Sequence, residues 1–251
     1  MRLLIVDGSN IAMRASLGGD IHPDQSTGTA TGIIERCARE YEATHLVVAL
    51  DSPTGMPSWR KVAYPEYKAN RTRDTTPWLA AGMAAWLRCG WWVEEHGGFE
   101  ADDLIATLAL RVKARGDIFV LSGDSDLLPL LADGIHLVKP VNGGQFSLIS
   151  REAMCAKYGL ANPAQLVDLK AMTGEAGDNV PGVDGIGTVR AQQLLARHAT
   201  LDAVIAAGRA GACKFSAKVL AQEAIARLAY SLISLNRAAP VLPIPPAHCA
   251  L

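Results

Sequence analysis

Four short apolar runs separated by helix-like stretches limit the fold more than any other feature of this sequence. The runs are LLIV at 3–6, HLVVAL at 45–50, DIFVLS at 117–122 and IHLVKP at 135–140. Continuous apolar runs of this length are typical of parallel strands that are buried on both faces of a sheet. Helices are expected in the stretches around them, at 28–42, 78–89, 101–115 and 125–132. The alternation predicts an α/β fold built on a doubly wound parallel sheet.

The sequence changes character after about residue 150, where it reads as helices joined by short loops. Ser150 is the expected N-cap of one helix. A second helix is expected to have Asn162 as its N-cap and Pro163 at its first position, and to end at Gly174. We therefore expect an α/β core in 1–150, a helical region in 151–235 and an extended, proline-rich tail in 236–251.

The composition excludes several classes of protein. The formal net charge is only −1, so any site for a polyanion must come from local clustering of cations. Five scattered cysteines without a CxxC pair argue against a disulfide framework and a zinc site, and for a reducing compartment. The N-terminal apolar stretch is too short for a signal peptide, and no apolar run approaches the roughly 18 residues of a membrane span. A cytoplasmic protein is the expectation.

Three of the predicted strands run into aspartates: Asp7, Asp51, and the pair Asp124 and Asp126. Because ligands of an open parallel sheet bind beyond the carboxyl ends of its strands, these side chains are expected at one edge. The stretch FEADDLIATLA at 99–109 opens a helix just before the third of these strands, so its acids are expected at the same edge. The edge then gathers seven acids, which are Asp7, Asp51, Glu100, Asp102, Asp103, Asp124 and Asp126.

So many carboxylates at one edge repel one another unless cations lie among them. Magnesium or manganese fits, because the ligands are all carboxylate oxygens and no Cys or His lies nearby in the sequence. Two such ions about 4 Å apart would clamp the attacking and the leaving oxygen of a phosphodiester. Taken singly, each acid reads equally well as a turn or cap residue, and only their coincidence at one edge favours the metal interpretation.

A basic segment follows the second aspartate. Residues 56–73, MPSWRKVAYPEYKANRTR, carry five cations and one acid, a net charge of +4. Trp59, Tyr64 and Tyr67 lie between the cations, as in surfaces that bind phosphates and stack on unpaired bases. The alternative is a solvated charged surface with Trp59 in the core.

A glycine-rich turn lies at 178–190, DNVPGVDGIGTVR, directly before a helical stretch. Such a turn brings backbone N–H groups close to a phosphate of duplex DNA without reading bases. Thr188 and Arg190 would add contacts. The alternative is a plain turn between two helices.

Together these stretches resemble the structure-specific 5′ nucleases, or flap endonucleases. That family includes the 5′–3′ exonuclease domain of bacterial DNA polymerase I and short stand-alone bacterial homologues. The resemblance covers residues 1–235, and the matching stretches stand in family order: LLIVDGSN, ALDSP, SWRKVAYPEYKANR, FEADDLIATLA, LSGDSDLLPLL and GDNVPGVDGIG.

The resemblance implies a divalent-metal-dependent 5′–3′ exonuclease or flap endonuclease acting at duplex–5′ single-strand DNA junctions, in DNA replication or repair. It implies two Mg²⁺ or Mn²⁺ ions held by the seven acids and Asp178, and an arch in about 56–98. Lys68 and Arg71 are expected to engage the scissile phosphate, with Asp102 and Asp124 as the other catalytic residues. Tyr64 and Tyr67 are expected to stack on a displaced base.

The resemblance also implies a helix–three-turn–helix module in 164–197 that grips duplex DNA. Its expected DNA contacts are Gly185, Ile186, Gly187, Thr188 and Arg190. Such modules often bind potassium through backbone carbonyls, here expected near Met172, Thr173, Pro181, Val183 and Ile186. The expected partners are DNA with 5′ flaps, nicks or ends, with no membrane, and the chain is expected to act as a monomer.

One position departs from the family pattern. In TGEAGDN, Glu175 stands where active members commonly have an aspartate, which adds one methylene and is expected to weaken the second metal site. Three rival functions remain open: a PIN-type ribonuclease, a catalytically inactive DNA-junction binder and, more remotely, a phosphatase.

Overall fold

The computed structural model describes residues 1–17, 20–52 and 56–243, and the chain forms two compact units. The first, called here the core unit, comprises Met1–Trp59, Arg73–Ile149 and Leu235–Leu251. The second, the helical unit, comprises Arg60–Thr72 and Ser150–Ser234. The chain therefore crosses from one unit to the other four times.

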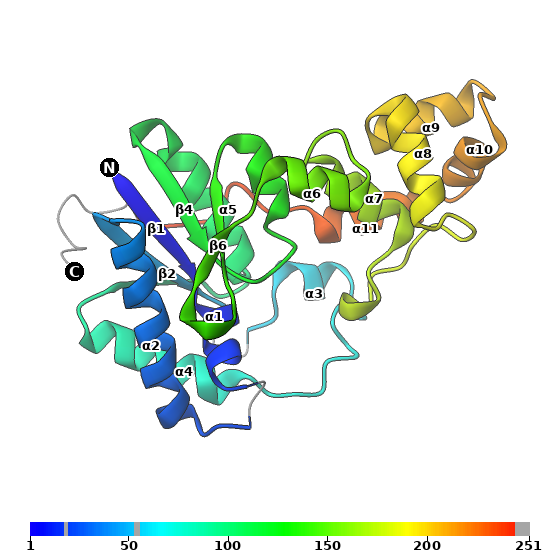
Figure 1. Ribbon diagram of the computed structural model, residues 1–251. Helices are drawn as coiled ribbons and strands as arrows, with labels where there is room; N and C mark the ends of the chain where they lie inside the picture. Colours follow the sequence, from blue (N-terminus) through cyan, green and yellow to red (C-terminus); the bar gives the residue numbers. More distant parts are fainter. Residues whose placement is uncertain (18–19, 53–55, 244–251) are drawn as a thin grey trace. The chain divides into compact units, whose positions relative to one another are not determined.

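A six-stranded sheet forms the centre of the core unit (Figure 1). Its strands are β1 (Arg2–Asp7), β2 (His45–Leu50), β3 (Trp92–Glu95), β4 (Asp117–Leu121), β5 (His136–Pro140) and β6 (Phe146–Leu148). The strand order is β3-β2-β1-β4-β5-β6, with all pairs parallel except β5–β6. Since β1 lies between β2 and β4, the aspartates at or just after the carboxyl ends of these three strands are brought to neighbouring positions at one edge.

Helices cover both faces of this sheet. They are α1 (Gly8–Ala15), α2 (Pro23–Glu40), α4 (Thr76–Arg88) and α5 (Ala101–Val112), with short 3₁₀ turns at Lys113–Arg115, Leu128–Asp133 and Asn142–Gly144. Residues of α1, α2 and α4 bury one cluster with Leu4 and Val6 of β1. Leu3 and Ile5 alternate with them and face the other side, where α5 packs on β1, β2 and β3.

Gly8 lets α1 start directly against the sheet. A Cβ at this position would lie 2.6 Å from Cγ1 of Val48 and 2.8 Å from Cδ2 of Leu50, too close for any other residue. The tight turn holds Asp7 at the very end of β1, where the helix begins.

The helical unit contains the rest of the helices. They are α6 (Arg151–Tyr158), α7 (Gln165–Thr173), α8 (Thr188–His198), α9 (Leu201–Arg209), α10 (Lys214–Ala221) and α11 (Glu223–Ile233), with a 3₁₀ turn at Ala176–Asp178. α7 packs against α8 and α11, and α9 packs against α10. α3 (Trp59–Ala63) starts at the last residue of the first core segment and continues into this unit.

A buried arginine ties the segment 60–72 to the helical unit. Arg60 is 2% exposed, and its Nε donates to the carbonyl of Leu232 over 2.7 Å. Its guanidinium also donates to the carbonyl of Ser234 over 3.0 Å, so it satisfies carbonyls at the end of α11. These bonds explain why part of the expected arch groups with the helical unit rather than with the sheet.

The start of the expected tail is bound to the core unit. The backbone N–H of Ala239 donates to Thr107 Oγ1 over 3.1 Å, and Arg111 donates to the carbonyl of Val241 over 2.7 Å. These residues therefore lie against α5. Residues 244–251 of the expected tail lie outside the described part of the chain.

The α/β class and the four strands expected from apolar runs are confirmed. β3 and β6 were not expected, because β3 is only half-buried and β6 has three residues at the sheet edge. The helix expected at 125–132 is a 3₁₀ turn that begins at Leu128. α7 ends at Gly174 as expected, but it begins at Gln165 instead of Pro163, because Asn162 caps only the turn before it.

Candidate active site

Asp7 provides the first carboxylate at the sheet edge. One oxygen accepts a hydrogen bond from the backbone N–H of Asn10 over 2.9 Å, and the other accepts from the hydroxyl of Ser122 over 2.6 Å. Burial is the main cause that raises the pKa of Asp7 to about 7. The negative charges of Asp51 and Asp124 also raise this pKa, against the two hydrogen bonds. The edge is therefore a poor environment for anions without a cation.

Asp51 connects the second strand end to the acidic helix. Its Oδ1 accepts a hydrogen bond of 2.8 Å from the backbone N–H of Ala101, the first residue of α5. Its own N–H donates to Ser9 Oγ over 2.9 Å. Glu100 precedes α5 at the N-cap position. These contacts place the N-terminus of α5 at the ends of β1 and β2, as the alternation of strands and helices predicts.

Three carboxylates meet closely at this edge. Asp102, Asp124 and Asp126 each offer one oxygen, and these atoms lie within 4.8 Å of one another. The loop after β4 is fixed locally, since the N–H of Asp124 donates to Ser122 Oγ and the N–H of Asp126 donates to Asp124 Oδ1, both over 2.9 Å. All three side chains are half-buried, so the group is open to an ion from one side.

This group fits a divalent cation by its donors and its electrostatics. The pKa of Asp102 is raised well above its ordinary value, first by burial and then by the charges of Asp7 and Asp124. A carboxylate that resists ionisation because of neighbouring anions is stabilised by a positive ion among them. Oxygen-only donors suit magnesium or manganese.

Asp103 does not belong to this three-acid group, unlike its neighbour Asp102. It is fully buried, and its Oδ2 accepts from the indole Nε1 of Trp59 over 2.9 Å. Its Oδ1 accepts from the backbone N–H of Asn236 over 2.8 Å. Since both oxygens accept hydrogen bonds within the core unit, this geometry favours a positioning role over the metal-ligand role expected from sequence.

In the helical unit, Asp178 is surrounded by the basic segment. Arg71 donates to its Oδ1, Tyr67 Oη donates to its Oδ2 over 3.3 Å, and Lys68 Nζ lies 3.8 Å from Oδ2. The backbone N–H of Lys68 also donates to the carbonyl of Asp178 over 2.8 Å. Lys68 has φ +54°, a left-handed conformation that is unfavourable for a non-glycine residue and is held by these contacts. Lys68 and Arg71 thus meet at one carboxylate.

The two tyrosines of the basic segment differ from each other in burial. Tyr67 is 4% exposed, and Lys68 Nζ lies 4.9 Å from the centre of its ring. Tyr64 is half-buried. The burial of Tyr67 argues for a role in holding Asp178 and Lys68 rather than for contact with an unpaired base.

Glu175 forms an ion pair with Lys170. Lys170 Nζ, on α7, lies 2.9 and 3.0 Å from the two carboxylate oxygens of Glu175. The backbone of Glu175 pairs with Val180 through two hydrogen bonds of 3.0 Å. A cation that binds Glu175 would have to compete with Lys170.

The glycine-rich turn is a close-packed backbone structure. A Cβ on Gly182 would lie 2.4 Å from the backbone C and O of Thr173, and one on Gly174 would lie 2.6 Å from the N of Gly182. Two of the expected potassium ligands are also hydrogen-bond acceptors here. The carbonyl of Met172 accepts from Val183 N over 2.8 Å, and that of Val183 accepts from Ile186 N over 3.0 Å.

The hairpin turns at Gly185 and leads directly into α8. Gly185 has φ +75°, which favours glycine, and its carbonyl accepts a 2.6 Å hydrogen bond from Arg190. Gly187 is the N-cap of α8 and Thr188 its first residue, and apart from its chain neighbours no atom of the described residues lies within 4 Å of a Cβ on Gly187. The turn followed by a helix is confirmed, and its backbone is accessible around Gly187.

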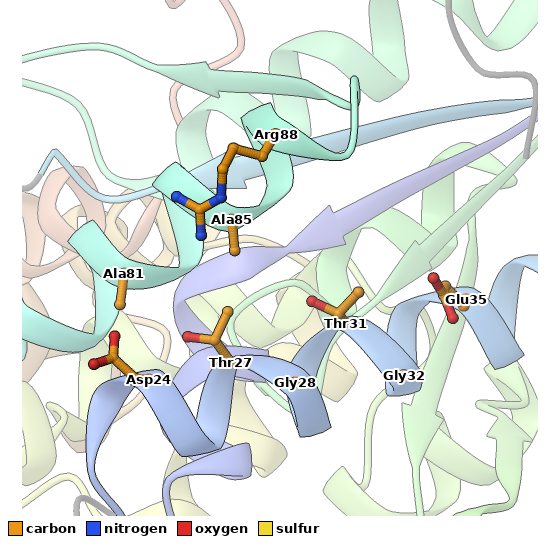
Figure 2. Close-up of a pocket in the computed structure, with 9 residues that line it drawn as sticks. All are labelled: Asp24, Thr27, Gly28, Thr31, Gly32, Glu35, Ala81, Ala85 and Arg88. Carbon is orange, nitrogen blue, oxygen red and sulfur yellow. The ribbon is translucent and has the colours of Figure 1, made fainter.

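A groove between α2 and α4 of the core unit has a volume of about 410 Å³. Figure 2 shows the side chains that line it, which include Asp24, Thr27, Thr31, Glu35, Ala81, Ala85 and Arg88. None of the seven acids of the sheet edge is among its lining residues. The acidic edge is therefore a separate feature.

Sequence reasoning missed several residues that hold the sites. Ser122 and Asn10 fix Asp7, Trp59 binds Asp103, and Lys170 binds Glu175. Two of these residues lie close in sequence to the acid that they contact: Asn10 is three residues after Asp7, and Lys170 is five residues before Glu175. The pairs Ser122–Asp7 and Trp59–Asp103 join residues far apart in the chain.

Two family models match consecutive parts of the chain. The model described as 5′-3′ exonuclease, N-terminal resolvase-like domain, matches residues 2–159. The model described as 5′-3′ exonuclease, C-terminal SAM fold, matches residues 161–250. Together they cover both the sheet with its acidic edge and the helices with the glycine hairpin.

Curated relatives include proteins of two lengths. The chain is 32% identical to DNA polymerase I of Bacillus caldotenax over 96% of its own length, which is 28% of that protein. It is 31% identical to the 5′-3′ exonuclease of Bacillus subtilis over 81% of its own length and 73% of that protein. The chain thus spans about a quarter of the polymerases it matches and most of the shorter exonuclease.

Solved structures share the fold. The T5 5′-exonuclease with bound zinc superposes with a TM-score of 0.79 at 24% identity, over 94% of this chain and 90% of that one. The bacteriophage T5 D15 flap endonuclease in a complex with DNA and metal ions superposes with a TM-score of 0.77 at 23% identity, over the same shares. At this level of identity the likeness concerns the fold.

Proposed function

Because this chain belongs to the 5′-3′ exonuclease family, we propose that it is a divalent-metal-dependent nuclease. Its substrate is DNA in which a duplex meets a 5′ single strand, as at flaps, nicks and ends, and its setting is DNA replication or repair in the cytoplasm. It acts as a monomer. In the described residues, no helix is both long and apolar enough to span a bilayer.

The observation that carries the proposal is the convergence of Asp102, Asp124 and Asp126, with oxygens within 4.8 Å of one another. These carboxylates would hold Mg²⁺ or Mn²⁺. A bound ion of this kind supplies Lewis-acid chemistry, which lowers the pKa of water and stabilises negative charge on a phosphate. Asp7 and Asp51 would add negative charge to the same edge.

Phosphate binding and duplex binding would depend on cationic side chains and on the backbone of the chain. Lys68 and Arg71 would bind the phosphate and stabilise charge that develops on its oxygens. Both contact Asp178, so the substrate phosphate competes with this carboxylate for them. The hairpin at Gly185–Gly187 would bind the duplex backbone without reading bases, and its carbonyls would hold a potassium ion.

One observation favours a second candidate, a catalytically weak junction-binding protein. Lys170 contacts both oxygens of Glu175, and Arg71 and Lys68 contact Asp178. Both acids expected to support a second metal are thus paired with cations. A protein that holds only one ion well would bind junctions and cut them slowly.

A magnesium titration with a labelled 5′-flap DNA tests the proposal. Cleavage near the junction is expected to need Mg²⁺ and to vanish in Asp124→Asn, which removes one carboxylate of the three. The matched control is Asp24→Asn, which removes an exposed acid in the α2–α4 groove and should cut as wild type does.

Either of two outcomes would contradict the proposal and favour a rival function. Flap binding without cleavage at any magnesium or manganese concentration would establish the binding protein. Faster cleavage of single-stranded RNA of the same sequence would establish a PIN-type ribonuclease.

A further inference from the structure

Helix α10 presents an aromatic ring between two cations. The guanidinium of Arg190, on α8, lies 4.8 Å from the centre of the Phe215 ring. Nζ of Lys214, on α10, lies 5.1 Å from the same centre. Cation–π attraction therefore holds the two charges near one apolar surface, although they come from helices some 25 residues apart in the chain.

A second lysine of α10 adjoins the glycine hairpin. A Cβ on Gly185 would lie 2.6 Å from Nζ of Lys218, so the ammonium group lies directly over the hairpin backbone. Arg190 donates to the carbonyl of Gly185 at the same turn. Asp184, next to this glycine, exchanges hydrogen bonds with Gln222, the residue just after α10. The hairpin and α10 thus form one continuous surface.

In the described part of the chain, no carboxylate lies within ion-pair distance of Arg190, Lys214 or Lys218, and all three side chains are exposed. Elsewhere in the helical unit, Arg209 and Arg227 pair with Glu223. Three unneutralised cations that are held together repel one another, which an external polyanion relieves.

We propose that α10 supplies a second set of contacts to the DNA backbone, formed by Lys214 and Lys218 beside Phe215 and Arg190. The ligand is duplex DNA, and this proposal rests on the proposed function for that choice. The hairpin binds one stretch of phosphates through backbone N–H groups, and α10 extends the contact by charge. In a duplex the bases are stacked on one another, so they do not stack on Phe215. The ring instead orients the two cations next to it.

Binding of a short blunt-ended duplex, measured by fluorescence anisotropy in EDTA so that no cleavage occurs, tests the proposal. Lys214→Ala and Lys218→Ala are each expected to weaken binding about 3–10-fold. Each should reduce the slope of log K against log salt by about 1, because each removes one phosphate contact. Lys218→Arg should bind with nearly wild-type affinity, since it keeps the positive charge over Gly185.

The matched control is Arg151→Ala on α6, which removes one exposed cation of the same unit. Arg151 is the first residue of α6, at the opposite end of this helix from Tyr158, whose carbonyl accepts a hydrogen bond from Gln192 of α8. Its affinity and salt slope should equal those of the wild type. Unfolding curves that coincide for all variants are expected, because both lysines are exposed.

The proposal is overturned if the Lys214→Ala, Lys218→Ala double variant binds duplex with wild-type affinity and salt slope. A flap-cleavage assay with the same proteins separates this result from the proposed function. The double variant should raise KM and leave kcat unchanged. If the wild type binds duplex but cuts nothing, the proposed function fails while the contacts of α10 stand; if it cuts but the double variant binds normally, only the α10 proposal fails.

Discussion

The indole nitrogen of Trp59 donates a 2.9 Å hydrogen bond to Oδ2 of Asp103, whose Oδ1 accepts one of 2.8 Å from the backbone of Asn236. Asp103 thus connects the start of α3, the first turn of α5 and the segment that follows α11. Its neighbour Asp102 belongs to the three-acid group instead. Two consecutive acids of one sequence motif therefore have different roles: Asp103 holds three segments together, and Asp102 belongs to the candidate metal site. Substitution of each acid should show this difference.

Asp103→Asn is expected to destabilise the protein by about 1–3 kcal/mol, because the amide NH₂ would face one of two N–H donors in a buried place. Urea unfolding in EDTA measures the loss. Asp24→Asn, at an exposed position, should change stability by less than about 0.5 kcal/mol. Equal stability of Asp103→Asn and wild type would contradict the positioning role.

Asp102→Asn is expected to stabilise the metal-free protein. The pKa of Asp102 is raised by burial and by neighbouring acids, so its ionised form costs stability at neutral pH. Removing the charge should raise Tm by about 2–4 °C. Magnesium should then raise Tm of the wild type but not of the variant. A lower Tm for the metal-free variant would show that the acids do not repel one another.

The metal-free protein should lose stability as pH rises. The folded pKa of Asp7 is about 7, above the ordinary value of 3.8. The stabilising contribution of its protonated form is complete below the ordinary value and is lost as pH rises through about 7. Magnesium should therefore raise Tm more at about pH 8 than at about pH 6, because it must displace this proton. Melting curves with and without EDTA measure both effects, and an equal gain at the two pH values would contradict the account.

Lys170→Met should destabilise the protein by about 1–2 kcal/mol, because it removes the cation that contacts both oxygens of half-buried Glu175. The double variant with Glu175→Gln should recover most of this loss. A double-mutant cycle from urea unfolding gives the coupling energy. Additive effects of the two changes would mean that the pair does not hold the loop.

Two glycines of the hairpin should respond differently to alanine. Gly182→Ala places a Cβ 2.4 Å from the backbone of Thr173 and is expected to cost about 1–3 kcal/mol. Gly187→Ala places a Cβ that, apart from chain neighbours, meets no described atom within 4 Å, so it should leave stability within about 0.5 kcal/mol of wild type. It should weaken duplex binding, however, because its methyl group stands where the backbone would approach a phosphate. Urea unfolding and fluorescence anisotropy separate the two effects.

The sequence by itself determined the parts of this protein that depend on local pattern. Apolar runs predicted β1, β2, β4 and β5, because a buried strand needs no partner-specific signal beyond its hydrophobicity. The position of the aspartates at the carboxyl ends of β1, β2 and β4 followed from the chain direction of a parallel sheet. The glycine spacing at 182–187 predicted the turn before α8.

Only the tertiary structure decided which carboxylate does what. Nothing local separates Asp102 from Asp103, yet α5 turns one to Asp124 and Asp126 and the other to Trp59. The same holds for Arg71, whose partner Asp178 lies more than a hundred residues away. The physical reason is that a helix sends consecutive side chains in different directions, and ion pairs depend on distances that sequence separation does not encode.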